Sequence, residues 1–304
     1  MSIVVSGVTK FYGDQKALDN VSFQVNTGEI VAFLGPNGAG KSTMMKIITG
    51  YIPASSGSVI VNGVETSADN LEIRKKIGYL PENNPLYPEM YVREYLKFAA
   101  SLYKTGKSAA KRMDHIIEVT GLVPEQKKKI GSLSKGFRQR VGLAQALIHD
   151  PDVLILDEAT TGLDPNQVVE IRNLIREAGR EKTVMLSTHI MQEAEAVCDR
   201  IIIIDKGVIV ADEKKEDIYS KIRLPHQVVR VEFDKDPGEP ALLTIPGVIN
   251  ARHIKQDLWL IEAEGKDDIR PAIFSFAVKN NLTVLSLQKE ESSLEEVFRH
   301  LTSG

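Results

Sequence analysis

The chain of 304 residues has one cysteine, Cys198. One thiol excludes a disulfide framework and a metal site built from cysteines, so we expect Cys198 to be a buried structural residue. No apolar run approaches the roughly 18 residues that a membrane-spanning helix requires. The longest runs, such as Ile201 to Ile204, are as short as a strand. The N-terminus lacks a basic segment followed by an apolar one, so we expect no secretory signal.

A strong excess of one charge is also absent. The formal net charge is −3, which does not suggest a nucleic-acid partner, because such domains are usually basic. A composition with 42% hydrophobic and 26% charged residues is that of an ordinary globular protein. The length suits one large and one small domain, or two of medium size. We therefore expect a cytoplasmic protein that reaches a membrane only through a partner.

Five short runs predict strands in the first two-thirds of the chain. One alternates apolar and polar residues, and the other four are largely apolar, as in strands buried on both faces. In order they are Val21 to Val25, Ile30 to Leu34, Val153 to Leu156, Thr183 to Leu186 and Ile201 to Ile204. Helix-like stretches lie between them, at Lys41 to Thr49, Gln167 to Glu181 and Met191 to Val197. This alternation predicts an α/β domain whose core sheet is substantially parallel.

Two other regions depart from this alternation. Residues from about 85 to 150 contain no convincing strand and predict a helical insertion, with helices at Val92 to Tyr103, Ala109 to Thr120 and Gly136 to His149. After a charged helix expected at Lys214 to Arg223, Pro225 marks a linker. Residues 227–304 then predict a small α+β domain, with strands at Val228 to Phe233, Leu258 to Ala263 and Leu282 to Leu287, and helices at Asp268 to Asn280 and Ser293 to Leu301.

A phosphate-binding loop is the first chemical motif. Residues 35–42 fit the pattern G-x-x-x-x-G-K-[ST], between a predicted buried strand and a predicted helix. Glycines let the backbone turn tightly and bring its N–H groups against phosphate oxygens. The start of the helix adds its positive dipole end. Lys41 can neutralise the phosphates and the Ser42 hydroxyl can bind Mg²⁺. An ordinary glycine-rich turn is the alternative, and the combined context argues against it.

Three polar residues follow predicted buried strands. Asp157 ends one strand, so its carboxylate emerges at the edge of the sheet where α/β proteins bind ligands, and it can hold Mg²⁺. Glu158 comes next and can orient or deprotonate an attacking water. His189 lies just past another strand, expected to neighbour the first, from which it could reach a terminal phosphate. The alternatives are that the carboxylates cap the next segment and that the histidine is structural.

The most selective motif is the run of residues 133–139, Leu-Ser-Lys-Gly-Phe-Arg-Gln, just before the strand that ends in Asp157 and Glu158. A Leu-Ser-x-Gly element that opens a helix at this place resembles the signature sequence and Walker B strand of the ATP-binding cassette (ABC) family. Together with the phosphate loop and His189, the ordered set resembles the nucleotide-binding subunit of ABC transporters. The resemblance covers roughly residues 1–222.

The resemblance implies a P-loop NTPase fold, with a mixed core sheet and a helical subdomain at about 85–150, and an enzyme that hydrolyses ATP with Mg²⁺. It assigns catalysis to Lys41, Glu158 and His189, and metal binding to Ser42, Asp157 and Glu82. The implied ATP contacts are Tyr12, which would stack on adenine, and Asn37, Gly38, Ala39, Gly40, Lys41, Ser42, Thr43, Glu82, Ser134, Gly136 and Asp164. The segment Ala159 to Asp164 resembles the family's D-loop.

The resemblance also implies partners. Two subunits, either copies of this chain or related ATPases, would enclose two ATP molecules head-to-tail. Each site would join the phosphate loop of one subunit to Ser134 and Gly136 of the other, and cleavage of the terminal phosphate would release the interface. A separate integral membrane permease would be driven from the inner face of the cell membrane, and residues 83–88 with the helical insertion would form a groove for it.

Four positions depart from the usual pattern of the family. Lys135 replaces a glycine of the signature and Phe137 its glutamine; we expect Lys135 to point outward and leave the ATP contacts intact. Glu82 replaces the usual glutamine, which adds negative charge beside the phosphates. Ala159 replaces a proline, which loosens the D-loop slightly. Leu-Ser-Lys-Gly and Tyr-Leu-Pro-Glu resemble the branch that works with ABC-2-type permeases, largely exporters, and the overall texture slightly favours its gliding-motility group.

Two alternatives belong to other classes. A soluble cassette ATPase acting in translation, repair or cofactor assembly shares the motifs, but translation factors carry two cassettes and repair relatives carry long coiled coils. A P-loop kinase or GTPase shares only the phosphate loop. The sequence does not identify a cargo, because cargo contacts would belong to the permease.

Overall fold

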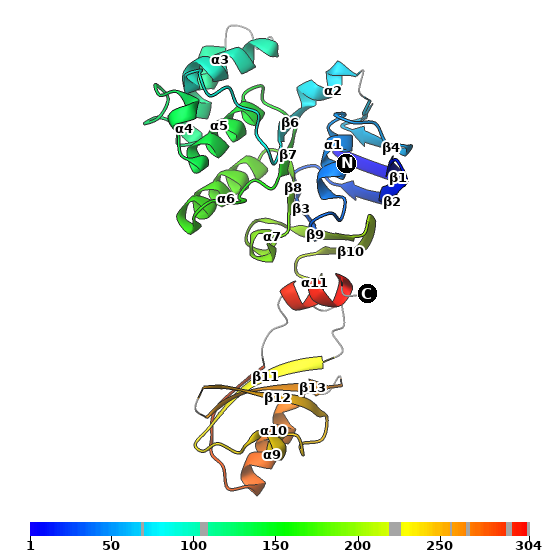
Figure 1. Cartoon of the computed structure of the whole chain (residues 1–304), viewed down its shortest axis with the longest axis vertical. Helices are drawn as coiled ribbons and strands as arrows, with labels where there is room; N and C mark the ends of the chain where they lie inside the picture. Colours follow the sequence, from blue (N-terminus) through cyan, green and yellow to red (C-terminus); the bar gives the residue numbers. More distant parts are fainter. Residues whose placement is uncertain are drawn as a thin grey trace. The chain divides into compact units, whose positions relative to one another are not determined.

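The computed structural model describes residues 1–67, 70–103, 109–218, 226–255, 257–265, 268–289 and 294–302. The chain divides into two compact units, Met1–Lys215 and Glu216–Gly304. Figure 1 labels their helices and strands in chain order. Each unit has its own sheet and hydrophobic core, and each is described separately below.

The first unit is built on a six-stranded sheet. Its order is β10-β9-β3-β8-β7-β6, with β10 antiparallel to β9 and the other neighbours parallel. The strands are β3 (Ile30–Leu34), β6 (Ile77–Leu80), β7 (Val153–Asp157), β8 (Thr183–Thr188), β9 (Arg200–Asp205) and β10 (Val208–Lys214). Every residue of β3, β7 and β8 is buried, which explains their continuous apolar runs. The expected mixed core sheet is confirmed, with β6 and β10 as additional strands.

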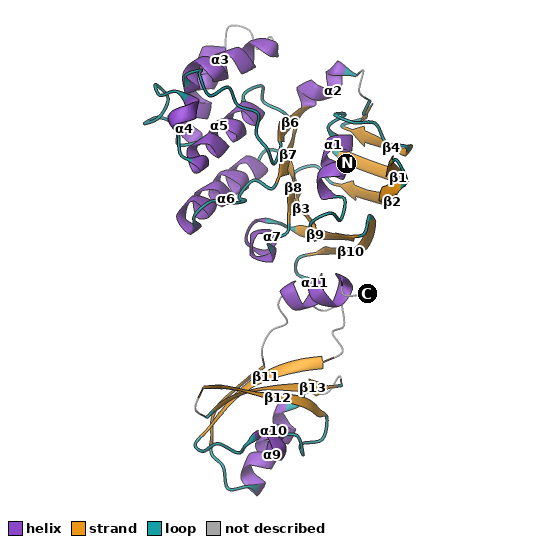
Figure 2. Cartoon of the chain, in the orientation of Figure 1, coloured by secondary structure: helices purple, strands orange, loops and turns teal. Residues whose placement is uncertain are grey.

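A second, antiparallel sheet covers helix α1 (Lys41–Ile48) from the other side. Its order is β2-β1-β4-β5, with strands β1 (Ile3–Tyr12), β2 (Gln15–Val25), β4 (Ser56–Val61) and β5 (Val64–Glu65). Helix α1 contacts β2 and β4 of this sheet and β7 and β8 of the six-stranded sheet. Phe33, Met44 and Met45 belong to the shared core. Figure 2 shows α1 with strands on both sides. The phosphate loop is thus attached to a helix packed between two sheets.

Helices interrupt the first unit where no strand was expected. The insertion contains α3 (Val92–Leu102), α4 (Ala109–Val119), a 3₁₀ turn at Ile130–Ser132 and α5 (Lys135–Leu147). Helices α3 and α5 pack against each other, and α4 contacts both. The remaining helices of the unit are α2 (Leu71–Lys76), α6 (Pro165–Gly179) and α7 (Met191–Val197). The helical character expected for this region is confirmed, and α5 positions the signature residues at its N-terminus.

The second unit has a four-stranded antiparallel sheet of order β12-β13-β11-β14. Its elements are β11 (His226–Phe233), α9 (Glu239–Leu242), β12 (Val248–Lys255), β13 (Leu258–Glu264), α10 (Arg270–Lys279), β14 (Val284–Lys289) and α11 (Leu294–Thr302). Phe233, Trp259 and Ile273 are buried in its core. The helix expected at 214–223 does not begin there, because Lys214 is the last residue of β10, paired with Arg200. Residues 219–223 of that prediction lie outside the described residues.

The single cysteine behaves as expected. Cys198 is 2% exposed, and burial raises the pKa of its thiol. Within the described ranges, no helix combines the length and apolar character needed to cross a bilayer.

Candidate active site

The loop between β3 and α1 passes close to neighbouring backbone at two glycines. Gly40 has a φ of +107°, and a Cβ there would lie 2.6 Å from the carbonyl oxygen of Ala17. A Cβ on Gly35 would lie 2.5 Å from the carbonyl oxygen of Ile204. A side chain at either place would have to displace backbone atoms. The spacing of glycines in the motif therefore reflects both the turn and the close approach of neighbouring segments.

Lys41 begins α1 with its side chain folded back over the loop. It is 5% exposed, and its Nζ donates to the carbonyl oxygens of Gly35 at 2.8 Å and Pro36 at 3.2 Å. Its Nζ also lies 3.6 Å from Oε1 of Glu158. Burial lowers the pKa of Lys41, and the Glu158 carboxylate opposes that shift. The ammonium is thus held at the centre of a loop suited to anions, where phosphate oxygens would supply further negative charge.

Asp157 is the last residue of β7 and is 1% exposed. Its Oδ1 accepts hydrogen bonds from the Ser42 hydroxyl at 3.1 Å and from the Ser187 hydroxyl. The pairing of Asp157 with Ser187 in the parallel register of β7 and β8 brings the second hydroxyl there. Ser187 was not among the predicted site residues, although its place near the end of a buried strand was a usable signal.

Glu158 has a φ of +54°, a left-handed conformation that non-glycine residues rarely adopt. Its N–H donates to the Ser187 carbonyl oxygen at 3.1 Å, and its carboxylate accepts from the Thr161 hydroxyl at 2.6 Å. Burial opposes ionisation, but hydrogen bonds from His189 and Thr161 and the charge of Lys41 outweigh it, so the pKa of Glu158 is lowered. Strained backbone held by its surroundings is typical of functional sites.

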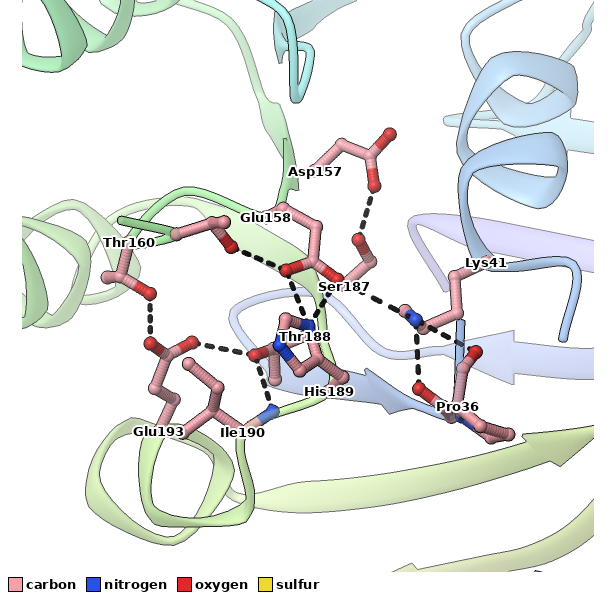
Figure 3. Close-up of polar contacts among 12 residues, drawn as sticks. Pro36, Lys41, Asp157, Glu158, Thr160, Ser187, Thr188, His189, Ile190 and Glu193 are labelled. Carbon is pink, nitrogen blue, oxygen red and sulfur yellow. Dashed lines mark hydrogen bonds and ion pairs between the residues drawn. The ribbon is translucent and has the colours of Figure 1, made fainter. Parts of the chain in front are cut away.

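His189 follows β8, which neighbours β7 as expected and pairs with β3 on its other side. Its Nδ1 is 3.0 Å from Oε1 and 2.9 Å from Oε2 of Glu158, with the carboxylate as acceptor. The imidazole is 39% exposed, whereas Glu158 is 7% exposed. Figure 3 shows Lys41, Glu158 and His189 converging from three different segments of the chain. The structure therefore places all three predicted catalytic residues together.

These side chains line one cavity of about 550 Å³. The lining includes the predicted residues Tyr12, Asn37, Gly38, Gly40, Lys41, Ser42, Thr43, Glu82, Glu158 and His189. Gln15, Ala17 and Thr161 also line it and were not predicted. Tyr12 is 48% exposed at the cavity, where a flat ring is available to an aromatic ligand. Ala39 is 3% exposed and packs in the core instead.

Glu82 lines this cavity and also a neighbouring one of about 550 Å³. Ser42 lines both as well, and Asp157 lines the neighbouring one. A hydroxyl and two carboxylates are hard oxygen donors, the kind that Mg²⁺ prefers in phosphate sites. The donor set at this edge of the sheet thus fits a magnesium ion bound together with phosphates.

The signature residues occupy the N-terminus of α5. Ser134 is the N-cap, and its hydroxyl accepts from the N–H of Phe137 at 3.3 Å. Gly136 is buried, and a Cβ there would lie 2.5 Å from the side chain of Gln167. Lys135 is exposed, and its Nζ lies beside Gly162. A Cβ built on Gly162 would be 2.1 Å from that Nζ. Its side chain therefore lies along the D-loop.

Asp164 is the N-cap of α6, where its carboxylate accepts from the N–H of Gln167 at 3.0 Å. Asp164, Ser134 and Gly136 are not among the described residues that line the cavity around Lys41. The contacts of these three residues with ATP stay predictions.

Comparison with known proteins agrees with this geometry. Residues 18–161 match the protein-family profile described as "ABC transporter", and residues 220–302 match "ATP-binding protein DrrA1-3-like, C-terminal domain". The linearmycin resistance ATP-binding protein LnrL of Bacillus subtilis is 34% identical over 97% of this chain and 96% of its own length. The bacitracin transport ATP-binding protein BcrA of Bacillus licheniformis is 33% identical over 99% of this chain and 97% of its own length.

Solved structures are similar to the first unit. One, described as an ATP-binding subunit of an ABC transporter, has a TM-score of 0.67 at 30% identity and covers 73% of this chain and 93% of its own. Another, described as a dimeric post-hydrolysis state of the cassette MJ0796 bound to ADP and Pi, has a TM-score of 0.65 at 29% identity, with 70% and 98% covered. These similarities extend over nearly the whole chain, which therefore belongs to the ATP-binding subunits of ABC transporters, and it is an ATPase.

Proposed function

We propose that this chain powers an export permease by hydrolysing Mg-ATP between two ATPase subunits. The observation that carries the proposal is the meeting of Lys41, Glu158 and His189 around one cavity. ATPase subunits of this family dimerise and work with a membrane permease. The homodimer, the ABC-2 type of permease and the direction of transport are the new parts of the proposal.

Hydrolysis follows from the chemistry of three side chains. The Lys41 ammonium neutralises the terminal phosphate, because it is already held over the phosphate loop. The Glu158 carboxylate accepts a proton from the attacking water, since its neighbours keep it in the acceptor form. The His189 ring donates from Nδ1 to that carboxylate and so orients it. Positioning and electrostatics dominate catalysis of phosphoryl transfer, and these three side chains supply both from one subunit.

Mg²⁺ would be held by Ser42, with Asp157 and Glu82 as further oxygen ligands. The metal would neutralise charge on the phosphates. The support for this assignment is the set of oxygen donors. The Ser42 hydroxyl donates a hydrogen bond to Asp157, and Glu82 lines the same cavity as Ser42.

A second subunit is needed because the signature residues do not reach the cavity of their own chain. The free end of α5 offers backbone N–H groups and the Ser134 hydroxyl, which suit an anion. We propose that these groups bind the terminal phosphate of ATP held by the partner subunit's phosphate loop. The dimeric state described for the similar cassette supports this arrangement.

The permease would dock at the neighbouring cavity, which the loop after β6 borders. Its lining includes Tyr51, Tyr79, Asn84, Pro85 and His149. Three buried polar atoms among the described residues, Oη of Tyr79, Nδ2 of Asn84 and Nδ1 of His149, have no hydrogen-bond partner there. A permease helix would supply such partners. Because this cavity shares Ser42 and Glu82 with the ATP cavity, docking and nucleotide binding would influence one another.

The test is capture of the permease by the tagged full chain from detergent-solubilised membranes. We expect a polytopic integral membrane protein in the capture. In the test variant, alanine replaces Tyr51, which lines this neighbouring cavity and is 71% exposed. Val169→Ala on α6 is the matched control, since Val169 is exposed but is not among the described residues that line the cavity. Tyr51→Ala should weaken capture without slowing hydrolysis by the isolated chain. Equal capture of the permease by the two variants would refute the neighbouring cavity as the docking site.

Export and the ABC-2 type of permease are supported by the names of the relatives, and the position on the inner face of the cell membrane would follow from binding the permease there. These include a bacitracin transport protein and a Nod factor export protein of Rhizobium meliloti, the latter 34% identical over 99% of this chain. The gliding-motility assignment stays a prediction of the sequence. Inverted membrane vesicles carrying the purified permease and this chain would show the direction of transport.

A further inference from the structure

A buried carboxylate outside the predicted motifs connects the two loops that carry Glu158 and His189. Glu193, in the first turn of α7, is 4% exposed. Its Oε1 accepts from the Thr160 hydroxyl and its Oε2 accepts from the Thr188 hydroxyl at 2.7 Å. Thr160 lies two residues after Glu158, and Thr188 lies immediately before His189. We propose that Glu193 is a positioning residue that holds the general base and the histidine in register.

The three members of this connection, called the Glu193 bridge below, are all inaccessible to solvent. Thr160 is 4% exposed and Thr188 is 1% exposed. Thr188 is held further, because its hydroxyl accepts from the N–H of Ile190 at 3.0 Å. Buried hydrogen bonds to an ionisable group are stronger than exposed ones, and water cannot replace a lost partner without rearrangement. Each oxygen of the carboxylate thus fixes one loop. Figure 3 shows the bridge beside the contact between Glu158 and His189.

The backbone of Glu158 explains why such a connection is needed. Its φ of +54° is unfavourable for a residue with a side chain, and it persists only where surrounding contacts hold it. On the strand side, the Glu158 N–H bonds to the Ser187 carbonyl oxygen at 3.1 Å. On the loop side, the Glu193 bridge holds Thr160. Both attachments end on β8 or the loop after it, so they determine where the carboxylate lies relative to His189.

Glu193 is not among the described residues that line the ATP cavity. A role that acts only through the loops therefore predicts a loss of turnover without a loss of binding. This inference rests on the proposed roles of Glu158 and His189.

The test compares the full-length Thr160→Val and Glu193→Gln variants. Valine matches threonine in shape and removes only the hydroxyl that donates to Oε1. Glutamine has a single acceptor oxygen, so one of the two hydroxyls loses its acceptor. We expect kcat for ATP hydrolysis to fall about tenfold in either variant, less than the roughly 100-fold that a displacement of about 1 Å can cost, because the other contacts of Glu158 and His189 remain. The Kd for ATP should stay within about threefold. The combined variant should be no slower than the slower single variant, because both break one bridge.

Thr160→Ser keeps the hydroxyl and should restore kcat, and Glu181→Gln, an exposed carboxylate, is the matched control. A normal kcat in Thr160→Val would overturn the inference. So would a fall in kcat that only matches a fall in the folded, ATP-binding fraction, measured by thermal unfolding and nucleotide titration. Glu158→Gln run in parallel separates the two proposals. Normal hydrolysis by that variant would reject the general base itself, whereas its inactivity beside a normal Thr160→Val would reject only the Glu193 bridge.

Discussion

Replacing Glu158 with glutamine changes one carboxylate oxygen into an amide group and preserves the volume of the side chain. The substitution removes the negative charge 3.6 Å from Nζ of Lys41 and the acceptor for the proton of water. A general base contributes ~10²–10⁴-fold to a rate, which is about 3–5 kcal/mol of activation free energy. We therefore expect hydrolysis at saturating Mg-ATP to fall at least ~10²-fold.

The affinity of the variant for ATP should not fall with its rate of hydrolysis. Lys41 and Glu158 are 5% and 7% exposed, so their attraction at 3.6 Å is worth about 4–5 kcal/mol at an effective dielectric constant of 20. Without ATP, the variant lacks the attraction between Lys41 and the Glu158 carboxylate. With ATP bound, it also lacks the repulsion between that carboxylate and the phosphates. Lys41 keeps both carbonyl partners, Gly35 and Pro36. The Kd for ATP should therefore be unchanged or lower, and a stable ATP-bound dimer should accumulate.

Phosphate release, equilibrium dialysis with ATP and size-exclusion chromatography with Mg-ATP measure these three effects. Glu181→Gln serves as the control, because it removes an exposed carboxylate after α6. Hydrolysis by Glu158→Gln within about threefold of the wild-type rate would refute the assignment of the base. A monomer that binds ATP normally under these conditions would refute the sandwich.

Three further substitutions test other parts of the site. Ser134→Arg should reduce turnover ~10²-fold or more, because the arginine would block the site for the partner's phosphate. The Kd for ATP, measured by equilibrium dialysis, should not change. Normal turnover would show that the signature has no part in the mechanism. Gly40→Ala should lower the free energy of unfolding by about 1–3 kcal/mol and abolish ATP binding, because φ is +107° and a Cβ would lie 2.6 Å from the Ala17 carbonyl oxygen; urea unfolding and dialysis measure both. The pKa of Asp150 is lowered, chiefly by its bond from Lys182 and also by Arg112, so its stabilisation is present above the unfolded pKa and is lost as the pH falls through the folded one. Asp150→Asn should therefore lower the free energy of unfolding by about 1 kcal/mol at pH 7. The difference in Tm between variant and wild type should vanish at the acid end of the transition, and a difference that persisted there would contradict this cause.

Some strands were predictable because both of their faces are buried. A strand such as β3, or β7 up to Asp157, is apolar at each position because both faces are buried, so its sequence shows a continuous run. In contrast, β1 has register shifts against β2 and β4, which break the alternation of inward and outward residues. It was missed for this reason. The order of strands in the sheet follows from long-range pairing, which no local pattern reports.

Phosphate chemistry was predictable where spacing along the chain fixes geometry. The phosphate loop is local, since the loop and the start of α1 place Lys41 directly. The Glu193 bridge has no such signal, because Thr160, Thr188 and Glu193 are ordinary residues at unremarkable spacing. Only the packing of α7 against β8, with the hydrogen bond between Glu193 and Thr160, brings them together.

The sequence by itself determined the family and the ATPase chemistry, and it predicted Lys41, Asp157, Glu158 and His189 as site residues, because each belongs to a motif whose residues lie next to one another in the chain. Only the tertiary structure decided which side chains support them. It placed His189 against Glu158, gave Glu158 its left-handed backbone and directed Lys135 along the D-loop. Those facts depend on contacts between segments about 30 residues apart, and such contacts are set by packing of the whole domain rather than by local propensity.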